Sequence, residues 1–380
     1  MKVTFMTAVP ENPYSLIASR RLDGRVRAGF KPAPRSAWLL GWHRPISTGD
    51  ANMRTRRTVS LFLIGVGLAF CSIDGFARTC DKVRTPEPKM KVILDTDIGD
   101  DIDDAWALAF TISYQGFEPI GVTLTHGNTP ARAKIACKLL QITGRGNIPV
   151  FIGRKTNLMV FQQYSWAEDF TTKRPSTQSA ADFIVESVKR NPGEVTLMAI
   201  GPLENIADAL RKEPDLGKYV KRVVLMSGCV YGTAYGPGVP VAEYNVHESV
   251  ADAQLVYGSG LPLTIVPLDS TTHVRLSDDE RGRVANYNSP LTYALECLYR
   301  LWLKGPNDRM TLHDQLAIAE TASPGTFFGK RETLPLLVDS KGYTRIDREH
   351  GNPVKVCLEP KRDEFMNYYL GELTKQRLGL

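Results

Sequence analysis

Short apolar runs alternate with amphipathic segments along residues 91–380. Runs rich in Val, Ile and Leu predict strands, and apolar residues spaced three or four apart predict helices. The predicted strands are residues 91–95, 119–124, 148–151, 194–200, 222–226, 262–266 and 353–358. The predicted helices are residues 104–112, 131–143, 178–190, 203–212, 249–257, 290–303 and 315–321. This alternation predicts an α/β fold: a single domain with a mainly parallel central sheet and helices on both faces.

The formal net charge of +6 comes from the front of the chain. Residues 1–57 contain eleven Lys and Arg but only three acidic residues, which leaves 36 basic and 38 acidic residues in the remainder. The body of the protein is therefore close to neutral. Because nucleic-acid binding relies on concentrated positive charge, we expect no nucleic-acid partner.

A signal peptide explains the basic front end. Arg54, Arg56 and Arg57 precede a 12-residue apolar run, residues 59–70, and a small-x-small site follows at residues 75–77. The run is shorter than the roughly 20 residues that a transmembrane helix needs. We therefore expect a signal peptide over residues 53–77, export to the periplasm or beyond the cell, and no stable membrane anchor.

The position of the signal peptide also predicts the segments on either side of it. Because a signal peptide belongs at the start of a protein, residues 1–52 are predicted to be a non-native or disordered extension, with Met53 as the true start. Residues 78–90 are predicted to be a polar linker, and residues 91–380 a single folded domain.

The six cysteines are widely spaced and form no CxxC pair, which disfavours a zinc ribbon or a redox motif. Cys137 and Cys357 lie in apolar runs, so we expect them to be core residues.

Aspartates dominate the junction between the first predicted strand and the first predicted helix. Six of the ten residues from Asp95 to Asp104 are aspartates. A helix cap explains one or two of them. Two carboxylates about 4 Å apart repel by roughly 4 kcal/mol at an effective dielectric of about 20, so several on one loop need a counter-charge or bound protons. An all-oxygen ligand set favours Ca²⁺ or Mg²⁺ over zinc, although the spacing is not that of an EF-hand.

Five motifs make the chain resemble the inosine–uridine-type nucleoside hydrolases. The stretch ILDTDIGDDIDDAWAL is similar to that family's DxDxGxDDxxA signature with two extra residues. The other motifs follow in the family's order: HGN at residues 126–128, IGPLENIA at 200–207, VAEYN at 241–245 and LHDQLA at 312–317. The resemblance spans about residues 91–375. It implies the nucleoside hydrolase fold, calcium-dependent release of base from ribonucleosides, and a homodimer or homotetramer.

The resemblance also implies roles for individual residues. The calcium ligands would be Asp97, Asp104, the backbone carbonyl of Ile200, and Asp314. The ribose would be bound by Asp103, Asn128, Glu243 and Asn245, with Met226 packing nearby. A strict reading of the expanded signature would instead assign the ribose role to Asp101 and place Ile102 where a calcium ligand belongs. We prefer the register that keeps Asp103 and Asp104 as the pair, because it retains both carboxylates and the helix start.

Two of these residues have chemical roles. Asp97 is the predicted base that takes a proton from the attacking water. His313 is the predicted acid for the leaving base, with an equally open alternative in which it orients Asp314 or lines the pocket. We expect His126 to be structural and His247 to lie at the surface.

Two stretches depart from the family's pattern. The loop YGTAYGPGVPVAEYN lacks the asparagine that contacts the 5′-hydroxyl in many members, and QQYSWAEDF replaces a segment that often contains histidine. These departures leave open a non-catalytic protein that binds a nucleoside or sugar. A Mg²⁺-dependent phosphatase of the haloacid dehalogenase type is a further alternative, although Gly99 stands where its DxDx[TV] motif has Thr or Val.

Export makes a direct prediction about the mature protein. If residues 53–77 are a signal peptide, the native product begins near residue 78, and mass spectrometry of its tryptic peptides should find none from residues 1–77. A peptide from residues 1–52 in the native product would refute the assignment of Met53 as the start.

Overall fold

The computed structural model describes residues 88–234, 236 and 238–375, which lie within a compact unit, Lys82–Leu380. The predicted extension (residues 1–52), the signal peptide (residues 53–77) and most of the linker (residues 78–90) lie outside the described residues. Within the described part of the chain, no helix is long and apolar enough to cross a membrane.

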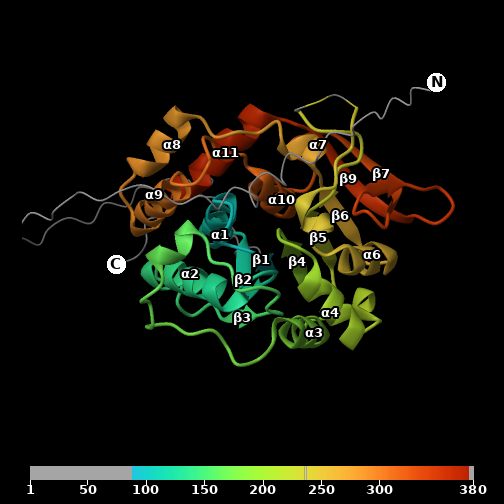
Figure 1. The fold of residues 1–380 in the computed structure, drawn as a ribbon, viewed down its shortest axis with the longest axis horizontal. Helices are drawn as coiled ribbons and strands as arrows, with labels where there is room; N and C mark the ends of the chain where they lie inside the picture. Colours follow the sequence, from blue (N-terminus) through green and yellow to red (C-terminus); the bar gives the residue numbers. More distant parts are fainter. Residues whose placement is uncertain (1–87, 235, 237, 376–380) are drawn as a thin grey trace, which may run out of the picture. The chain divides into compact units, whose positions relative to one another are not determined.

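A nine-stranded sheet forms the centre of the fold (Figure 1). Its order is β3-β2-β1-β4-β5-β6-β9-β7-β8, and every neighbouring pair from β3 to β9 is parallel. β7 runs antiparallel to both β9 and β8. The strands are β1 (Met90–Thr96), β2 (Phe117–Leu124), β3 (Val150–Ile152), β4 (Thr196–Ala199), β5 (Arg222–Met226), β6 (Leu263–Val266), β7 (Phe328–Val338), β8 (Thr344–Ile346) and β9 (Asn352–Pro360).

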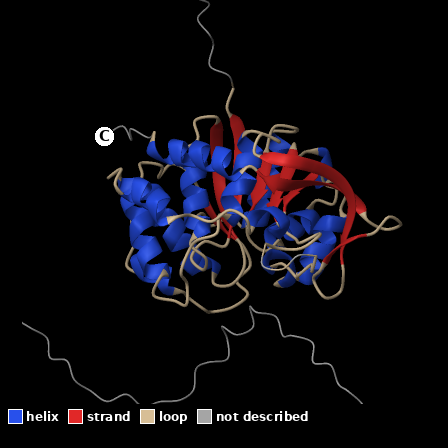
Figure 2. Ribbon diagram, turned by 90° about the horizontal axis from the view of Figure 1, so that it is seen from above, coloured by secondary structure: helices blue, strands red, loops and turns tan. Residues whose placement is uncertain are grey.

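Helices cover both faces of this sheet, as Figure 2 shows in a second view. They are α1 (Asp103–Ser113), α2 (Thr129–Ile142), α3 (Ala180–Arg190), α4 (Glu204–Lys212), α5 (Tyr244–His247), α6 (Val250–Gly258), α7 (Leu268–Thr271), α8 (Asp278–Ala285), α9 (Pro290–Trp302), α10 (His313–Ala322) and α11 (Arg362–Thr374). Among the described residues, two short 3₁₀ helices, η2 (Gln162–Trp166) and η3 (Leu216–Lys218), lie in the connections. The predicted single-domain α/β fold with a mainly parallel sheet is confirmed.

Alternating side chains on the strands build a separate core on each face. In β1, Val92 and Leu94 pack into the core formed with α1, α2 and α7–α11. Ile93, between them, packs into the other core with α3, α4 and α6. A strand buried on both faces reads as a continuous apolar run because successive side chains point to opposite faces. This burial accounts for the apolar sequence of residues 92–94.

The strand order reverses between β1 and β4. β1 is followed along the chain by β2 and β3 on one side, whereas β4 is followed by β5 and β6 on the other. At such a reversal the connections leave in opposite directions and open a crevice beyond the carboxyl ends of the strands, where ligands bind. The aspartate-rich loop follows β1 and Ile200 follows β4, so both lie at this crevice.

Several elements of the second half were not predicted from the sequence. β7 and β8 form the antiparallel edge of the sheet, and α8 and α11 belong to the helical layer beside α1. β7 has the sequence FGKRETLPLLV, in which charged residues and Pro335 interrupt the apolar pattern. Leu336–Val338 of β7 pair with β8, whereas the described pairing of residues 328–335 is with β9 alone. This part of β7 therefore lies at the edge of the sheet, where charged residues and proline are tolerated.

Cys137 and Cys357 are buried, as predicted, and His247 is exposed.

Gly153 offers a test of how closely the layers pack. A Cβ added there would lie 2.0 Å from Asn205 Oδ1 and 2.6 Å from the Leu124 carbonyl oxygen. Since one of these atoms is backbone of β2, Gly153→Ala should lower the free energy of unfolding by about 1–3 kcal/mol, measured by denaturant titration. Gly258→Ala, where a Cβ meets nothing within 4 Å, is the control and should change stability by less than about 1 kcal/mol. Equal effects of the two substitutions would contradict this description of the packing.

Candidate active site

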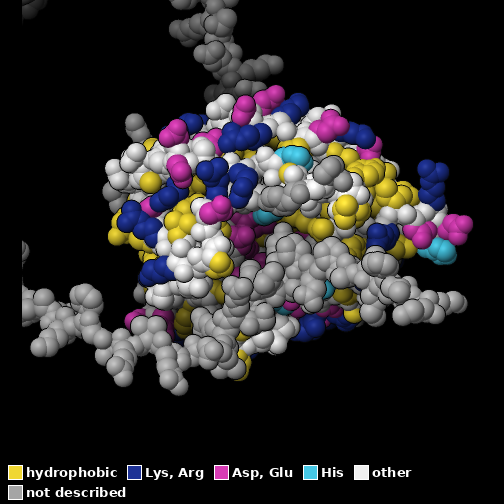
Figure 3. Space-filling model, turned by 45° about the horizontal axis from the view of Figure 1, so that its top comes forward, with side chains coloured by type: hydrophobic (Ala, Val, Ile, Leu, Met, Phe, Trp, Pro, Cys, Tyr) yellow, Lys and Arg dark blue, Asp and Glu magenta, His cyan; other side chains and the backbone are white. Residues whose placement is uncertain are grey.

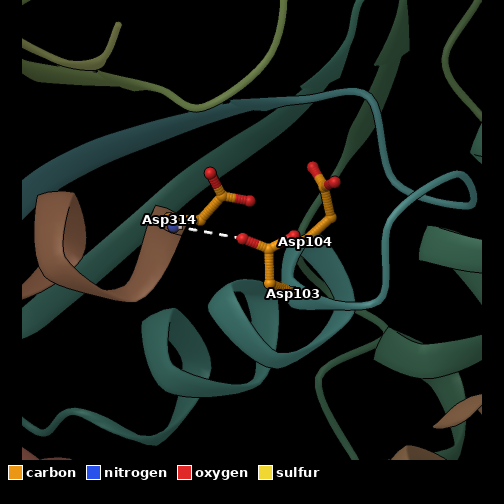
Figure 4. A group of neighbouring side chains, drawn as sticks. All are labelled: Asp103, Asp104 and Asp314. Atoms are coloured by element: carbon orange, nitrogen blue, oxygen red, sulfur yellow. Dashed lines mark hydrogen bonds between the residues drawn. The ribbon is translucent and has the colours of Figure 1, made fainter. Parts of the chain in front are cut away.

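Three aspartates converge beyond the carboxyl end of β1. Asp103 and Asp104 begin α1, and Asp314 lies in the first turn of α10. Each offers a carboxylate oxygen within 4.8 Å of the others, and each side chain is buried (Figure 4). The backbone N–H of Asp314 donates a hydrogen bond to Asp103 Oδ2 at 3.3 Å. The structure thus brings together side chains 210 positions apart from two different helices.

Two helix amino ends point at this cluster. The amino end of a helix carries a partial positive charge and unpaired N–H groups, so it attracts carboxylates. α1 and α10 contact one another, which places their acidic first turns side by side. Gln315 of α10 reinforces the contact by donating from Nε2 to the Asp103 carbonyl oxygen at 2.7 Å.

The helix ends offset only part of the cost of burying these charges. Burial raises the pKa of Asp103, Asp104 and Asp314 well above the usual value for aspartate. Repulsion from neighbouring aspartates, including Asp97, raises these pKa values further. Groups that resist ionisation in this way are stabilised as carboxylates by a bound cation. The donor set is oxygen only, which fits Ca²⁺ or Mg²⁺.

Asp97 lies near this cluster but is not one of the three converging residues. It is buried, and Arg132 Nη2 lies 3.6 Å from its Oδ2. Burial raises the pKa of Asp97, and the positive charges of Arg132 and His126 lower it by less than burial raises it. Gly201 leaves room for this carboxylate, since a Cβ there would lie 2.7 Å from Asp97 Oδ1.

The end of β1 sends its polar side chains to both faces of the sheet. Thr96 donates from Oγ1 to Asp104 Oδ1 at 2.5 Å, on the face of α1. Asp95, on the opposite face, accepts hydrogen bonds from Thr123 and from Asn205 of α4. Burial raises the pKa of Asp95 to about 7. Alternation along the strand therefore separates Asp95 from the cluster around Asp104.

Glu243 is held by backbone amides at the start of α5. Its carboxylate accepts N–H groups from Asn245 at 2.8 Å, Gly228 at 3.0 Å and Val246 at 3.2 Å. Burial nevertheless raises the pKa of Glu243 to about 7. These bonds orient both oxygens of the carboxylate.

Asn245 ties together the ends of two neighbouring strands. Its Nδ2 donates to the carbonyl oxygens of Ile200 at 3.1 Å and Met226 at 3.0 Å. The same nitrogen lies 3.4 Å from Met226 Sδ. The predicted carbonyl ligand Ile200 and the predicted ribose neighbours Met226 and Asn245 are therefore in direct contact.

Asn128 is the N-cap of α2. Its Oδ1 accepts the Ala131 N–H at 3.3 Å, and its Nδ2 donates to the Leu158 carbonyl at 3.2 Å.

His126 has the contacts of a structural residue. It is buried with a positive φ of 56°, and its Nδ1 lies 3.1 Å from Glu204 Oε1. Burial lowers the pKa of His126, but the hydrogen bond and charge of Glu204 outweigh it and raise the pKa above its ordinary value.

His313 is the first residue of α10, next to Asp314. Its Nδ1 lies 2.7 Å from Thr271 Oγ1. Burial, with a smaller effect from Arg275, lowers the pKa of His313 to about 4. The imidazole is therefore neutral at pH 7.

Sequence reasoning missed Arg132. Its guanidinium donates from Nε to the His126 carbonyl at 2.9 Å and from Nη1 to the Ile98 carbonyl at 3.2 Å, besides facing Asp97. One signal was present: Arg132 follows the cap Asn128 by four residues, about one helical turn, so both lie on the same side of α2.

The surface above the sheet carries this acidic character. On the face shown in Figure 3, acidic side chains gather in a recess next to a histidine.

The structure also separates the residues of the two alternative registers. Asp101, in contrast to Asp103 and Asp104, is exposed, whereas Ile102 is fully buried in the apolar core.

A family model and curated relatives agree on the family that this chain resembles. The model of the family described as inosine-uridine preferring nucleoside hydrolase matches residues 92–367. "Probable uridine nucleosidase 2" of Oryza sativa subsp. japonica is 31% identical over 70% of this chain and 84% of its own length. Uridine nucleosidase 1 of Arabidopsis thaliana is 30% identical over 68% of this chain and 82% of its own length.

Solved structures share the fold. A plant nucleoside hydrolase aligns with a TM-score of 0.68 and 24% identity, covering 76% of this chain and all of that one. The purine-preferring ribonucleoside hydrolase of Gardnerella vaginalis aligns with a TM-score of 0.65 and 23% identity, covering 75% and 98%.

The buried acids predict how stability depends on pH. A carboxyl group whose pKa rises on folding stabilises the folded state fully below its unfolded pKa, near 4, and this contribution is lost as pH rises through the folded value. Asp95 and Glu243, both raised to about 7, therefore favour folding at low pH, as do the three clustered aspartates. The lowered pKa of His313 makes the folded state more stable as pH rises from about 4 to 6.5. This single histidine opposes five carboxyl groups, so we expect the carboxyl groups to dominate.

In chelator, the thermal midpoint should thus fall between pH 5 and pH 8, as measured by scanning calorimetry. Added calcium chloride should raise the midpoint most at pH 8, where the carboxylates are least protonated. A chelated protein whose midpoint rises steadily over this range would contradict the assignment of buried, uncompensated carboxylates.

Proposed function

The chain belongs to the inosine-uridine preferring nucleoside hydrolase family, and from this premise we propose that it hydrolyses ribonucleosides to ribose and free base with the help of Ca²⁺. Members of the family are hydrolases of N-glycosyl bonds. The observation that carries the proposal is the buried cluster of Asp103, Asp104 and Asp314 at the reversal of the strand order.

The proposed ion ligands are Asp97, Asp104, Asp314 and the carbonyl oxygen of Ile200. The raised pKa values of Asp97, Asp104 and Asp314 support this assignment, because a cation offsets the burial and the repulsion that raise them. When bound, calcium would supply positive charge that orients a water molecule and the sugar's vicinal hydroxyls and moderately acidifies the water.

The register of the expanded signature follows from the same cluster. Asp103 and Asp104 are buried and face Asp314, whereas Asp101 is exposed and Ile102 is in the core. This arrangement supports Asp103–Asp104 as the family's aspartate pair, and it disfavours Asp101 as a sugar ligand.

Asp97 is the proposed base. Hydrolysis of an N-glycosidic bond builds positive charge on the ribose ring, so the attacking water must lose a proton as it bonds to the sugar. Arg132 holds one side of the Asp97 carboxylate and backbone carbonyls hold the guanidinium, so the base is restrained before substrate arrives.

The sugar would be bound by side chains that the backbone already orients. Asp103 and Glu243 accept hydrogen bonds from the ribose hydroxyls. The amide nitrogen of Asn245 already donates to the carbonyl oxygens of Ile200 and Met226. We therefore propose that its Oδ1 accepts a hydrogen bond from a ribose hydroxyl. Asn128 is proposed to contact the sugar from the start of α2.

His313 is proposed to act by hydrogen bonding. Its lowered pKa means that few molecules carry an imidazolium at pH 7, which weighs against an imidazolium as the acid for the leaving base. The nearby Thr271 hydroxyl orients the ring.

Competing functions receive less support. The family match includes the aspartate motif, so nothing favours the phosphatase of the haloacid dehalogenase type. Retention of Asp97 beside the three clustered aspartates argues against a protein that only binds sugar.

We also propose that the protein is exported through residues 53–77, with residues 78–90 as a linker to the hydrolase domain, residues 91–380. A homodimer or homotetramer remains an expectation, testable by light scattering of the purified protein.

Activity on nucleosides is the decisive test. We expect the protein to release free base from at least one of a panel that includes uridine, cytidine and inosine, with loss of activity in chelator and recovery with calcium. Asp97→Asn should lower kcat about 10²–10⁴-fold, because it removes the base. Free base is measured by liquid chromatography.

Asp101→Asn is the matched control within the same loop. The residue is exposed, and asparagine keeps the Oδ1 acceptor for the Ile102 N–H at 2.6 Å, so activity should stay within about twofold of the parent. An Asp97→Asn variant with parental kcat would remove Asp97 from its role, and a large loss in Asp101→Asn would favour the other register.

A further inference from the structure

We propose that Gln163 is a positioning residue that clamps the expanded aspartate loop and so maintains the spacing between Asp97 and Asp103 on which the cation site depends. The proposal rests on the proposed function, because it concerns the same ion site.

The loop between Asp97 and Asp103 is longer than the family signature requires. Five residues, 98–102, stand where the signature has three. Ile98 and Ile102 are both fully buried, which holds the two ends of the loop. Its middle, Asp100 and Asp101, reaches the surface and has no such apolar anchor.

Gln163 supplies an anchor for this middle part. Its Nε2 donates to the Asp101 carbonyl oxygen at 2.8 Å and to the Asp100 carbonyl oxygen at 3.1 Å. The side chain is 1% exposed. Because both partners are acceptors, only the amide nitrogen fits this position, and a carboxylate of the same shape would face two carbonyl oxygens without a proton to donate. Within the described residues, Oε1 is buried and accepts no hydrogen bond, so the amide acts there purely as a donor.

The segment that carries Gln163 is itself held firmly. η2 packs against α2 and α9. From α2, Lys134 donates to the Glu168 carbonyl at 2.6 Å, and Lys138 donates to the Trp166 carbonyl. The Lys138 ammonium also lies 4.4 Å from the centre of the Trp166 ring. Because its segment is bonded to α2, Gln163 fixes the aspartate loop relative to α2.

Two departures from the family's pattern therefore contact each other. The expanded signature contributes the carbonyls of Asp100 and Asp101, and the stretch QQYSWAEDF contributes the amide of Gln163. A longer loop has more conformations to lose when it must hold Asp97 and Asp103 at one spacing. Two hydrogen bonds to its middle reduce that cost before the ion binds, which is preorganisation of the site.

The test compares Gln163→Met with Gln162→Met in the full chain. Methionine keeps the length of the side chain and removes the donor. Gln162 lies on the same 3₁₀ helix but is exposed, so it serves as the matched control. Calcium chloride is titrated into metal-free protein by isothermal calorimetry, and the thermal midpoint is measured in chelator. We expect Gln163→Met to weaken calcium binding to the folded protein about tenfold and also to lower the midpoint in chelator, because two carbonyl oxygens lose their donor. Gln162→Met should keep the parent's calcium affinity and midpoint.

A purely structural role would lower the midpoint without changing the affinity of the folded protein for calcium. Parental calcium affinity in Gln163→Met would overturn the proposal, as would equal weakening in both variants. If Gln163→Met does not fold, Gln163→Leu decides by the same rule, because leucine has no donor and introduces no titratable group. If neither folds, the proposal is wrong as stated, since Gln163 then supports the fold rather than adjusting the site.

The outcome separates this inference from the proposed function. A parent chain that binds calcium and releases base, together with a Gln163→Met variant of equal affinity, overturns only the clamp. A parent chain that binds no calcium overturns the proposed function and the clamp with it.

Discussion

Burying several carboxylates of like charge at the edge of an apolar sheet is the constraint on which the rest of the structure depends. Asp103, Asp104 and Asp314 are excluded from water and face one another, and their raised pKa values express the cost. The protein offsets part of it with the amino ends of α1 and α10, and with the guanidinium of Arg132 beside Asp97. These contributions are smaller than the cost of desolvation, so an ionised cluster needs a further positive charge. A divalent cation would supply that charge, and it would also orient a water molecule and the substrate for hydrolysis.

The fold delivers these groups from separate parts of the chain. The loop after β1 provides Asp97, and α1 provides Asp103 and Asp104. The reversal of the strand order brings the end of β4 beside them. Asp314 arrives from the helical layer, because α10 packs against α1. Asn245 then ties the Ile200 and Met226 carbonyls together. No single element contains a working site, and its geometry depends on packing between the sheet and the helices on both faces.

The sequence was informative where the physical signal was local. Apolar runs such as residues 92–94 predicted buried strands, and the aspartates between β1 and α1 predicted a cation site, because charge at a strand end is visible without the fold. Contacts made across the fold were not visible. Arg132 reaches Asp97 only after β2 and α2 are placed, and Gln163 meets Asp100 and Asp101 across 62 positions or more. β7 was not predicted because most of its length pairs with β9 alone, and such an edge accepts charged residues and Pro335, which obscure the alternation. The resemblance to the family supplied Asp314, whose position no local pattern indicates.

The most direct measurement of the central claim is a crystal structure of the mature chain grown with calcium chloride. The account predicts one ion within about 2.3–2.6 Å of carboxylate oxygens from Asp104 and Asp314, with the Ile200 carbonyl completing part of its shell. A well-ordered site in which these side chains keep their positions, but with no ion between them at saturating calcium, would contradict the account.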